Sequence, residues 1–239
     1  MSTVRTFPDA KAVAEACAQQ ILEWLRKAIA GNQNGLATMA ISGGSSPRVM
    51  FEIFAATEFR WDRVHLFWAD ERCVPADDAQ SNYKFTSETW LDPGHFPAAN
   101  VHRVRTELAP ADAAVAYVAE IRKVLGGGQI PVFDVIHRGM GPDAHTASLF
   151  PGEPLIANHT DIAAAVWVGK FKQWRVTLLP GVLEAARHTA MLVAGADKTE
   201  AFKSVPSGPY DPLKYPAQLA SRDGSNALWF VDAAAAAGV

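Results

Sequence analysis

Residues 132–152, VFDVIHRGMGPDAHTASLFPG, join a short apolar run to a glycine-rich polar loop. The apolar side chains at 132–136 predict a buried strand, and the Gly-Met-Gly-Pro segment at 139–142 ends it. Four polar side chains follow directly: Asp143, His145, Thr146 and Ser148. In open α/β sheets such loops lie beyond the carboxyl ends of the strands, where ligands bind. The stretch therefore predicts a central strand and a site. The alternative is a loop that only caps a short helix, with its histidine on the surface.

Strand-like and helix-like segments alternate along the rest of the chain. Apolar spacing and capping residues predict helices at about 9–31, 47–54, 81–91, 111–125, 182–187 and 197–204. Short apolar runs predict strands at 36–41, 64–69, 132–137, 162–168, 175–179, 189–195 and 227–231. This alternation predicts an α/β fold with a largely parallel sheet and helices on both faces. No repeat or linker divides residues 1–239, so a single domain is expected, with the alanine-rich tail 233–237 as a helix end.

Composition limits the functions that the chain can have. With 49% hydrophobic and 20% charged residues among 239, the sequence is globular. A net charge of -3 provides no field to attract nucleic acid or an anionic membrane. Cys17 and Cys73 lack metal-type spacing, and no signal peptide or apolar run of about 20 residues is present. These features predict a soluble cytoplasmic protein with free thiols.

A second glycine-rich loop lies between a predicted strand and a predicted helix. It comprises Ser42, Gly43, Gly44, Ser45, Ser46 and Pro47. The glycines allow close backbone approach, the serines add hydroxyl donors, and the helix N-terminus favours an anion. The loop matches neither the Walker nor the dinucleotide pattern. A small phosphorylated ligand fits it better than a nucleotide, and an ordinary turn is the alternative.

Three basic residues lie at the ends of predicted elements: Arg72, Arg175 and Lys198. A guanidinium can hold phosphate or carboxylate oxygens with two hydrogen bonds, although each residue taken singly is more often a surface charge. Asp70 and Glu71 precede Arg72, but side chains of adjacent residues diverge and do not suggest a metal site. Asn82 and Tyr83 are interpreted as helix-start residues.

Five motifs occur together in a fixed order along the chain. They are SGGSSP at 42–47, DERCVP with SNY at 70–83, GMGPDAHTASLFPG at 139–152, RVTL at 175–178 and AGADK at 194–198. Together they resemble the 6-phosphogluconolactonase family, within the larger glucosamine-6-phosphate isomerase/6-phosphogluconolactonase group. The resemblance covers about residues 5–235, and HTASLFPG is its most specific part.

The resemblance implies a Rossmann-like open sheet. It also implies hydrolysis of 6-phospho-D-glucono-1,5-lactone to 6-phosphogluconate in the oxidative pentose phosphate pathway, with no metal and no cofactor. It implies four catalytic residues: His145, Asp143, Arg72 and Lys198. It implies a substrate- and phosphate-binding set of Ser42, Gly43, Gly44, Ser45, Ser46, Arg72, Arg175 and Lys198. The only expected partner is the small phosphorylated sugar lactone, with no nucleic acid and no membrane. The oligomeric state does not follow from the sequence, and a monomer is slightly favoured.

Two departures from the family pattern lie within the 132–152 stretch. Ala144 replaces the usual glycine between the Asp and the His, and costs about 1–2 kcal/mol if the position needs a positive φ. His137 and Arg138 replace an apolar pair, so Arg138 is expected either to contact an anion or to crowd the pocket.

Three other functions fit the sequence less well. An amino-sugar-phosphate isomerase/deaminase of the same group usually has Asn-Glu-Pro after its His segment, where this chain has Ser148-Leu149-Phe150-Pro151. A non-enzymatic sugar-phosphate-binding domain of a transcription regulator needs a basic DNA-binding helix pair, but residues 1–35 supply one helix. Ser148 or Ser45 as a covalent nucleophile lacks the Gly-x-Ser-x-Gly pattern.

Overall fold

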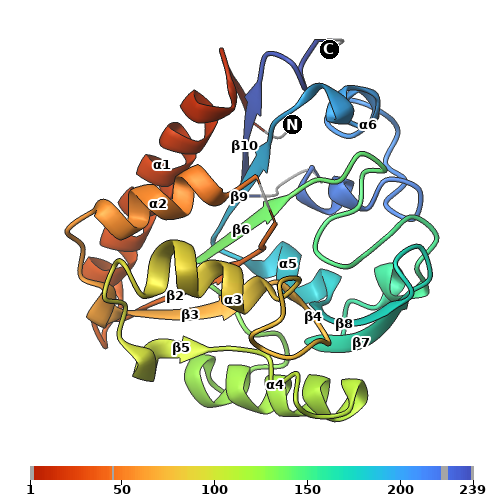
Figure 1. Cartoon of the computed structure of the whole chain (residues 1–239). Coiled ribbons are helices and arrows are strands. Elements are labelled where there is room, and N and C mark those ends of the chain that lie inside the picture. The colour runs from red at the N-terminus through yellow and green to blue at the C-terminus, as the bar shows by residue number, and fades with distance from the viewer. Residues whose placement is uncertain (1–2, 45, 222–225, 238–239) are drawn as a thin grey trace.

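A sheet of parallel strands forms the centre of the molecule (Figure 1). The computed structural model describes residues 3–44, 46–221 and 226–237. Within them the sheet has seven strands in the order β1-β10-β9-β6-β2-β3-β5. The strands are β1 (Thr3–Phe7), β2 (Ala37–Ile41), β3 (Val64–Trp68), β5 (Val101–His102), β6 (Val135–Gly139), β9 (His188–Val193) and β10 (Ala227–Asp232). The predicted Rossmann-like α/β sheet is therefore confirmed.

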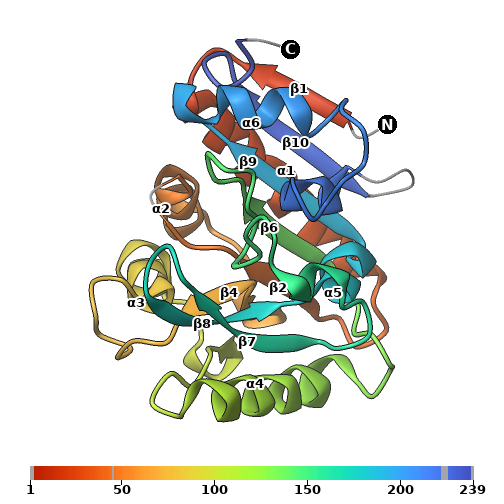
Figure 2. The same cartoon turned by 90° about the vertical axis from the view of Figure 1, so that its right-hand side faces the viewer.

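Helices cover both faces of this sheet (Figure 2). They are α1 (Ala10–Gly31), α2 (Arg48–Ala56), α3 (Asn82–Thr86), α4 (Pro110–Leu125), α5 (Pro180–Ala185) and α6 (Thr199–Ser204). A π-helix at Ser87–Leu91 continues α3, and single 3-10 turns lie at Trp61–Arg63, Ala98–Asn100, Pro154–Ala157, Ala196–Lys198 and Pro216–Ala220.

Side chains of one strand alternate between two apolar cores, as the pleat requires. In β3, Leu66 and Trp68 pack with α1 and α2, whereas Phe67 packs with α4 on the opposite face. The long α1 begins at Asp9, whose carboxylate accepts the backbone N–H of Ala12. Burial on both faces explains why the central strands have continuous apolar runs.

A second, antiparallel sheet packs beside the first one, in the order β4-β8-β7. Its strands are β4 (Asp70–Arg72), β7 (Ala163–Val168) and β8 (Gln173–Leu178). The strands predicted at 162–168 and 175–179 belong here, and the sequence did not predict that they form a separate antiparallel sheet. The turn between β7 and β8 is too short for a parallel crossover, which needs a dozen or more residues. The residues interpreted as a polar loop at 70–72 form an edge of this sheet.

Other local predictions were also wrong. Strand β1 was not predicted because its side chains are largely exposed and lack an apolar run, and β5 has only two residues. The tail at 233–237 forms turns and does not end a helix.

Parallel pairing brings the two glycine-rich loops together. Strands β2 and β6 are neighbours, with Ile41 opposite His137, and the Ser42 N–H donates to the His137 carbonyl oxygen over 3.0 Å. Because all strands of the main sheet are parallel, the loops after β2, β6 and β9 lie at one edge. A membrane-spanning helix is absent from the part of the chain described.

Candidate active site

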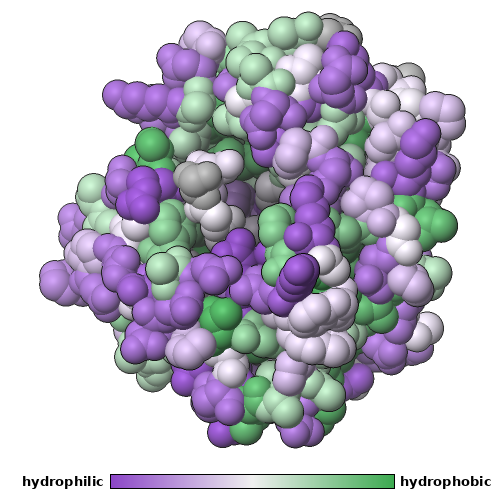
Figure 3. All heavy atoms as spheres, turned by 45° about the vertical axis from the view of Figure 1, so that its right-hand side comes forward, coloured by the Kyte–Doolittle hydropathy of each residue, from purple (hydrophilic) through white to green (hydrophobic). Residues whose placement is uncertain are grey.

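The loops at this edge enclose a cavity of about 210 Å³. Figure 3 shows a hollow near the middle of this face of the molecule. Every described residue predicted for the substrate site lines the cavity: Ser42, Gly43, Gly44, Ser46, Arg72, Arg175 and Lys198. His145 lines it as well, whereas Asp143 reaches it only through contact with His145. Ser45 lies outside the described residues. The structure thus places in one cavity side chains that are far apart in sequence.

His145 is held by contacts on its edge and on its face. Its Nδ1 lies 2.5 Å from the Asp143 carboxylate, and its ring stacks on Phe150 with centroids 4.2 Å apart. A carboxylate accepts the hydrogen bond, so Nδ1 donates, and in the neutral imidazole Nε2 then has the lone pair. A Cβ at Gly141 would overlap the imidazole, so glycine is needed there.

The carboxylate of Asp143 contacts both His145 and Lys170. One carboxylate oxygen contacts His145, and the other accepts from Lys170 Nζ over 2.9 Å. Partial burial alone would raise the pKa of Asp143, but the hydrogen bonds from His145 and Lys170 outweigh burial and hold that pKa well below its usual range. Asp143 is therefore a carboxylate at any working pH, and it orients the ring.

Ala144 has the left-handed backbone that the resemblance suggested. Its φ is +63°, which costs about 1–2 kcal/mol for a residue with a Cβ. Its methyl group is buried against Met140 and Ala217 in an apolar cluster, and burial of one methyl group returns about 0.8 kcal/mol. Burial of the methyl group therefore offsets part of the conformational cost, and His145 keeps its contact with Asp143.

The loop after β2 leads into an uncapped helix N-terminus. Helix α2 has Pro47 at its N-cap position and no side-chain hydrogen bond there, so its first N–H groups can bind an anion. Gly44 has a φ of +100°, and a Cβ at Gly43 would overlap the Asn82 side chain. The Ser42 hydroxyl is buried and has no hydrogen-bond partner among the described residues.

Cationic side chains outnumber carboxylates in the cavity lining. Arg72 and Arg175 are cross-strand neighbours and lie in the lining with Lys198, while Asp70 is the acid there among the described residues. Arg175 lies 4.0 Å from Asp70 and over the ring of Phe171. The cavity therefore favours an anion although the whole chain is slightly negative.

The Ser148 hydroxyl is hydrogen-bonded to Asp70 and is not free to act as a nucleophile. The side chain of Ser148 is fully buried, and its hydroxyl donates to Asp70 over 2.7 Å. Arg138 is also fully buried and lies outside the cavity lining, so both expectations for it, an anion contact and a crowded pocket, were wrong.

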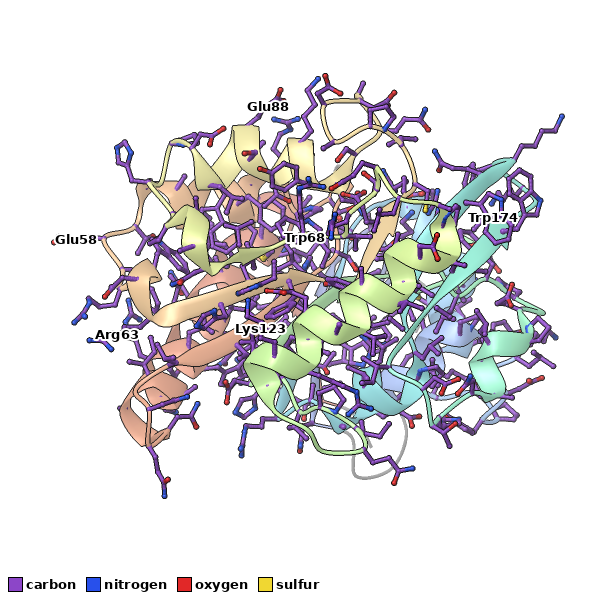
Figure 4. The ribbon with its side chains drawn as sticks, turned by 90° about the horizontal axis from the view of Figure 1, so that it is seen from below. Glu58, Arg63, Trp68, Glu88, Lys123 and Trp174 are labelled. Carbon is purple, nitrogen blue, oxygen red and sulfur yellow. The ribbon has the colours of Figure 1, made fainter. Side chains whose placement is uncertain are left out.

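Sequence reasoning missed four residues at the site. They are Asp70, Asn82, His137 and Lys170. Asn82 does begin α3 as predicted, but its side chain also borders the loop after β2. Lys170 reaches Asp143 from the turn between β7 and β8, a contact that no local pattern signals. Figure 4 shows this small sheet at the periphery, with exposed Trp174 on β8, whereas Trp68 lies in the interior.

His137 makes folding stability depend on pH. Burial lowers the pKa of its imidazole to about 3, from an ordinary value of 6.5. Between these values the unfolded chain binds a proton that the folded chain excludes, so stability falls as pH falls through this window. From pH 7 to pH 5 the expected loss from His137 is about 2 kcal/mol. Urea unfolding at pH 7 and pH 5 measures this loss of folding free energy.

The matched variant for this measurement is His137→Leu, which has no proton to exclude. Its free energy of unfolding should fall by about 2 kcal/mol less than that of the wild type over the same pH range. An equal fall in both proteins would contradict the assignment.

The described residues contain no group of three or more His, Cys, Asp or Glu side chains arranged to hold a metal ion. What the cavity contains is a histidine–carboxylate pair, three cations and a helix N-terminus.

Fold and cavity together define a Rossmann-like α/β protein with an anion-binding site at the carboxyl ends of its strands. The family model of glucosamine-6-phosphate isomerases/6-phosphogluconolactonase matches residues 8–229. The chain belongs to this family.

Relatives with known names are similar over nearly their whole length. The 6-phosphogluconolactonase of Nostoc sp. is 37% identical over 98% of this chain and 97% of that protein. That of Aggregatibacter actinomycetemcomitans is 34% identical over 97% of both. The crystal structure of 6-phosphogluconolactonase from Leishmania guyanensis has a TM-score of 0.86 and 27% identity, covering 100% of this chain and 99% of that one.

Proposed function

We propose that the chain is a 6-phosphogluconolactonase, which hydrolyses 6-phospho-D-glucono-1,5-lactone to 6-phosphogluconate in the oxidative pentose phosphate pathway. The observation that carries this proposal is the cavity shared by His145 and the loop after β2. An imidazole base and an anion site in one small cavity fit a phosphorylated sugar ester. The family membership supports the same activity.

His145 is proposed as the general base. Its Nε2 takes a proton from water, the water oxygen attacks C1 of the lactone, and the carbonyl π electrons move to the carbonyl oxygen. When the tetrahedral intermediate collapses, the bond from C1 to the ring oxygen breaks and His145 returns the proton to that oxygen. Asp143 holds the ring in the required tautomer and favours its transient positive charge.

The cations of the lining are proposed to bind charge at both ends of the substrate. Arg72 or Lys198 stabilises the oxyanion, and one well-placed donor contributes about 2.7–4 kcal/mol in other enzymes. The phosphate binds to the 42–46 loop, to the α2 N-terminus and to Arg175. Contacts remote from C1 position the ester for attack.

A coupled assay with freshly generated lactone tests the proposal. The wild-type chain should release 6-phosphogluconate well above the spontaneous opening of the lactone in water, which is subtracted. Ammonia release from glucosamine-6-phosphate without lactone turnover would replace the proposal by an isomerase/deaminase. Tight sugar-phosphate binding with no turnover would replace it by a binding domain.

Lys170 is proposed to steady the Asp143–His145 pair from the β7–β8 turn. Because its side chain is 55% exposed, the ion pair is worth at most about 1 kcal/mol. Lys170→Met should therefore lower kcat by about two- to fivefold. Lys172→Met, a change at an exposed lysine in the same turn, is the control and should leave kcat unchanged. Steady-state kinetics at low salt measures kcat for both variants. Equal kcat values would argue against a role of Lys170 in supporting the Asp143–His145 pair.

The cytoplasmic location is part of this proposal. Cys17 and Cys73 are both free, and free thiols suit a reducing compartment. The single-domain organisation and the monomeric state stay predictions.

A further inference from the structure

His137 lines the cavity and packs against α2. Its side chain is 1% exposed. Its ring meets the ring of Phe51, one turn into α2, edge-on with centroids 6.4 Å apart. Its carbonyl oxygen accepts the N–H of Ser42. The imidazole is therefore next to the loop that is proposed to hold the phosphate.

Neither ring nitrogen of His137 has a hydrogen-bond partner among the described residues. The neighbouring Ser42 hydroxyl is in the same situation. Buried polar groups in native proteins nearly always have partners, so an unpaired group on a residue that lines a cavity points to a ligand. Apolar packing would be served equally well by leucine, which has no polar atom to leave unpaired.

The chemistry of the ring suits a phosphate. Burial keeps the imidazole neutral because it lowers its pKa, so the ring has one N–H donor and one acceptor. Phosphate oxygens are acceptors only, and hydrogen bonds to charged acceptors are stronger than those between neutral groups. The uncapped N–H groups of α2 and the Ser42 hydroxyl supply further donors around the same point.

We propose that His137 is a further substrate-binding residue, whose ring N–H donates a hydrogen bond to the phosphate of the bound sugar beside Ser42 and the N-terminus of α2. The inference rests on the proposed function, because the anion is the phosphate of that substrate. It assigns to His137 a role in selecting phosphorylated over unphosphorylated lactones.

The test compares His137→Leu with His137→Gln, which keeps a side-chain donor. His137→Leu should raise KM for 6-phosphogluconolactone about tenfold and leave kcat within about twofold. It should weaken inhibition by inorganic phosphate by a similar factor, and His137→Gln should recover part of both losses. Hydrolysis of unphosphorylated glucono-1,5-lactone should not change, whereas a merely structural role would alter both substrates alike. His102→Leu, a change at a buried histidine outside the cavity, is the control.

Binding measured without turnover separates this inference from the proposed function. In NMR spectra of protein with ¹⁵N-labelled histidine, the ring signals of His137 are identified as those missing from the His137→Leu variant. Adding inorganic phosphate to the wild type should shift these signals. Lack of lactone turnover by the wild type would overturn the proposed function. The phosphate titration of the His137 signals would still test whether His137 binds phosphate. Unshifted His137 signals, or phosphate inhibition of His137→Leu within twofold of the wild type, would overturn the inference. If His137→Leu does not fold, His137→Gln serves to assign the signals.

Discussion

His145→Ala should lower kcat by about 10²–10⁴-fold and change KM much less. Without the imidazole, water must lose its proton to solvent while it attacks the lactone, and the departing ring oxygen loses its acid. Substrate affinity should persist because the proposed phosphate contacts are made by other residues of the cavity lining. The coupled assay with subtraction of spontaneous hydrolysis measures both constants.

The control for this variant is inhibition by inorganic phosphate, which should stay within about twofold of the wild type. Asp143→Asn, in which the imidazole remains but its tautomer is no longer fixed, should also lower kcat. Turnover of His145→Ala near the wild-type rate would show that His145 is not the base.

Arg175→Ala should raise KM by about 10–100-fold, with a smaller change in kcat. Loss of a charge-assisted hydrogen bond costs about 1.5–3 kcal/mol, and we place this bond at the substrate phosphate. Inhibition by inorganic phosphate and by the product should weaken in parallel.

Arg175→Lys separates binding from folding. The alanine variant leaves the buried Asp70 without its neighbouring cation, which destabilises the fold. The lysine variant keeps a cation there but loses the planar guanidinium that can bind two phosphate oxygens. It should keep a near wild-type melting temperature and an intermediate KM. Unchanged phosphate inhibition in both variants would remove Arg175 from the phosphate site.

Most of the central sheet could be predicted because its strands are buried on both faces and have continuous apolar runs. The two strands of the β7–β8 hairpin were predicted, but the second sheet that they form was not, since their residues have the same apolar pattern whichever sheet they join. The choice depends on the short turn between them and on edge pairing with β4, which forms through residues as polar as Asp70 and Glu71.

The site was predictable where motif and backbone geometry coincide. Ser42 and His145 lie in loops that parallel pairing brings to one edge, so their convergence follows from topology. Lys170 and Asn82 enter through contacts between distant segments, which residue type and spacing do not encode. At Ala144 the sequence raised the question of a positive φ, and only the packing of its methyl group shows how that conformation is stabilised.

Hydrolysis makes the bound sugar more anionic, because it converts an uncharged ester into a carboxylate while the phosphate remains. The lining holds Arg72, Arg175 and Lys198 against one acid, Asp70, among the described residues. The field that attracts the lactone therefore retains the open-chain acid at least as strongly. We therefore expect the departure of 6-phosphogluconate to limit the cycle once chemistry is fast.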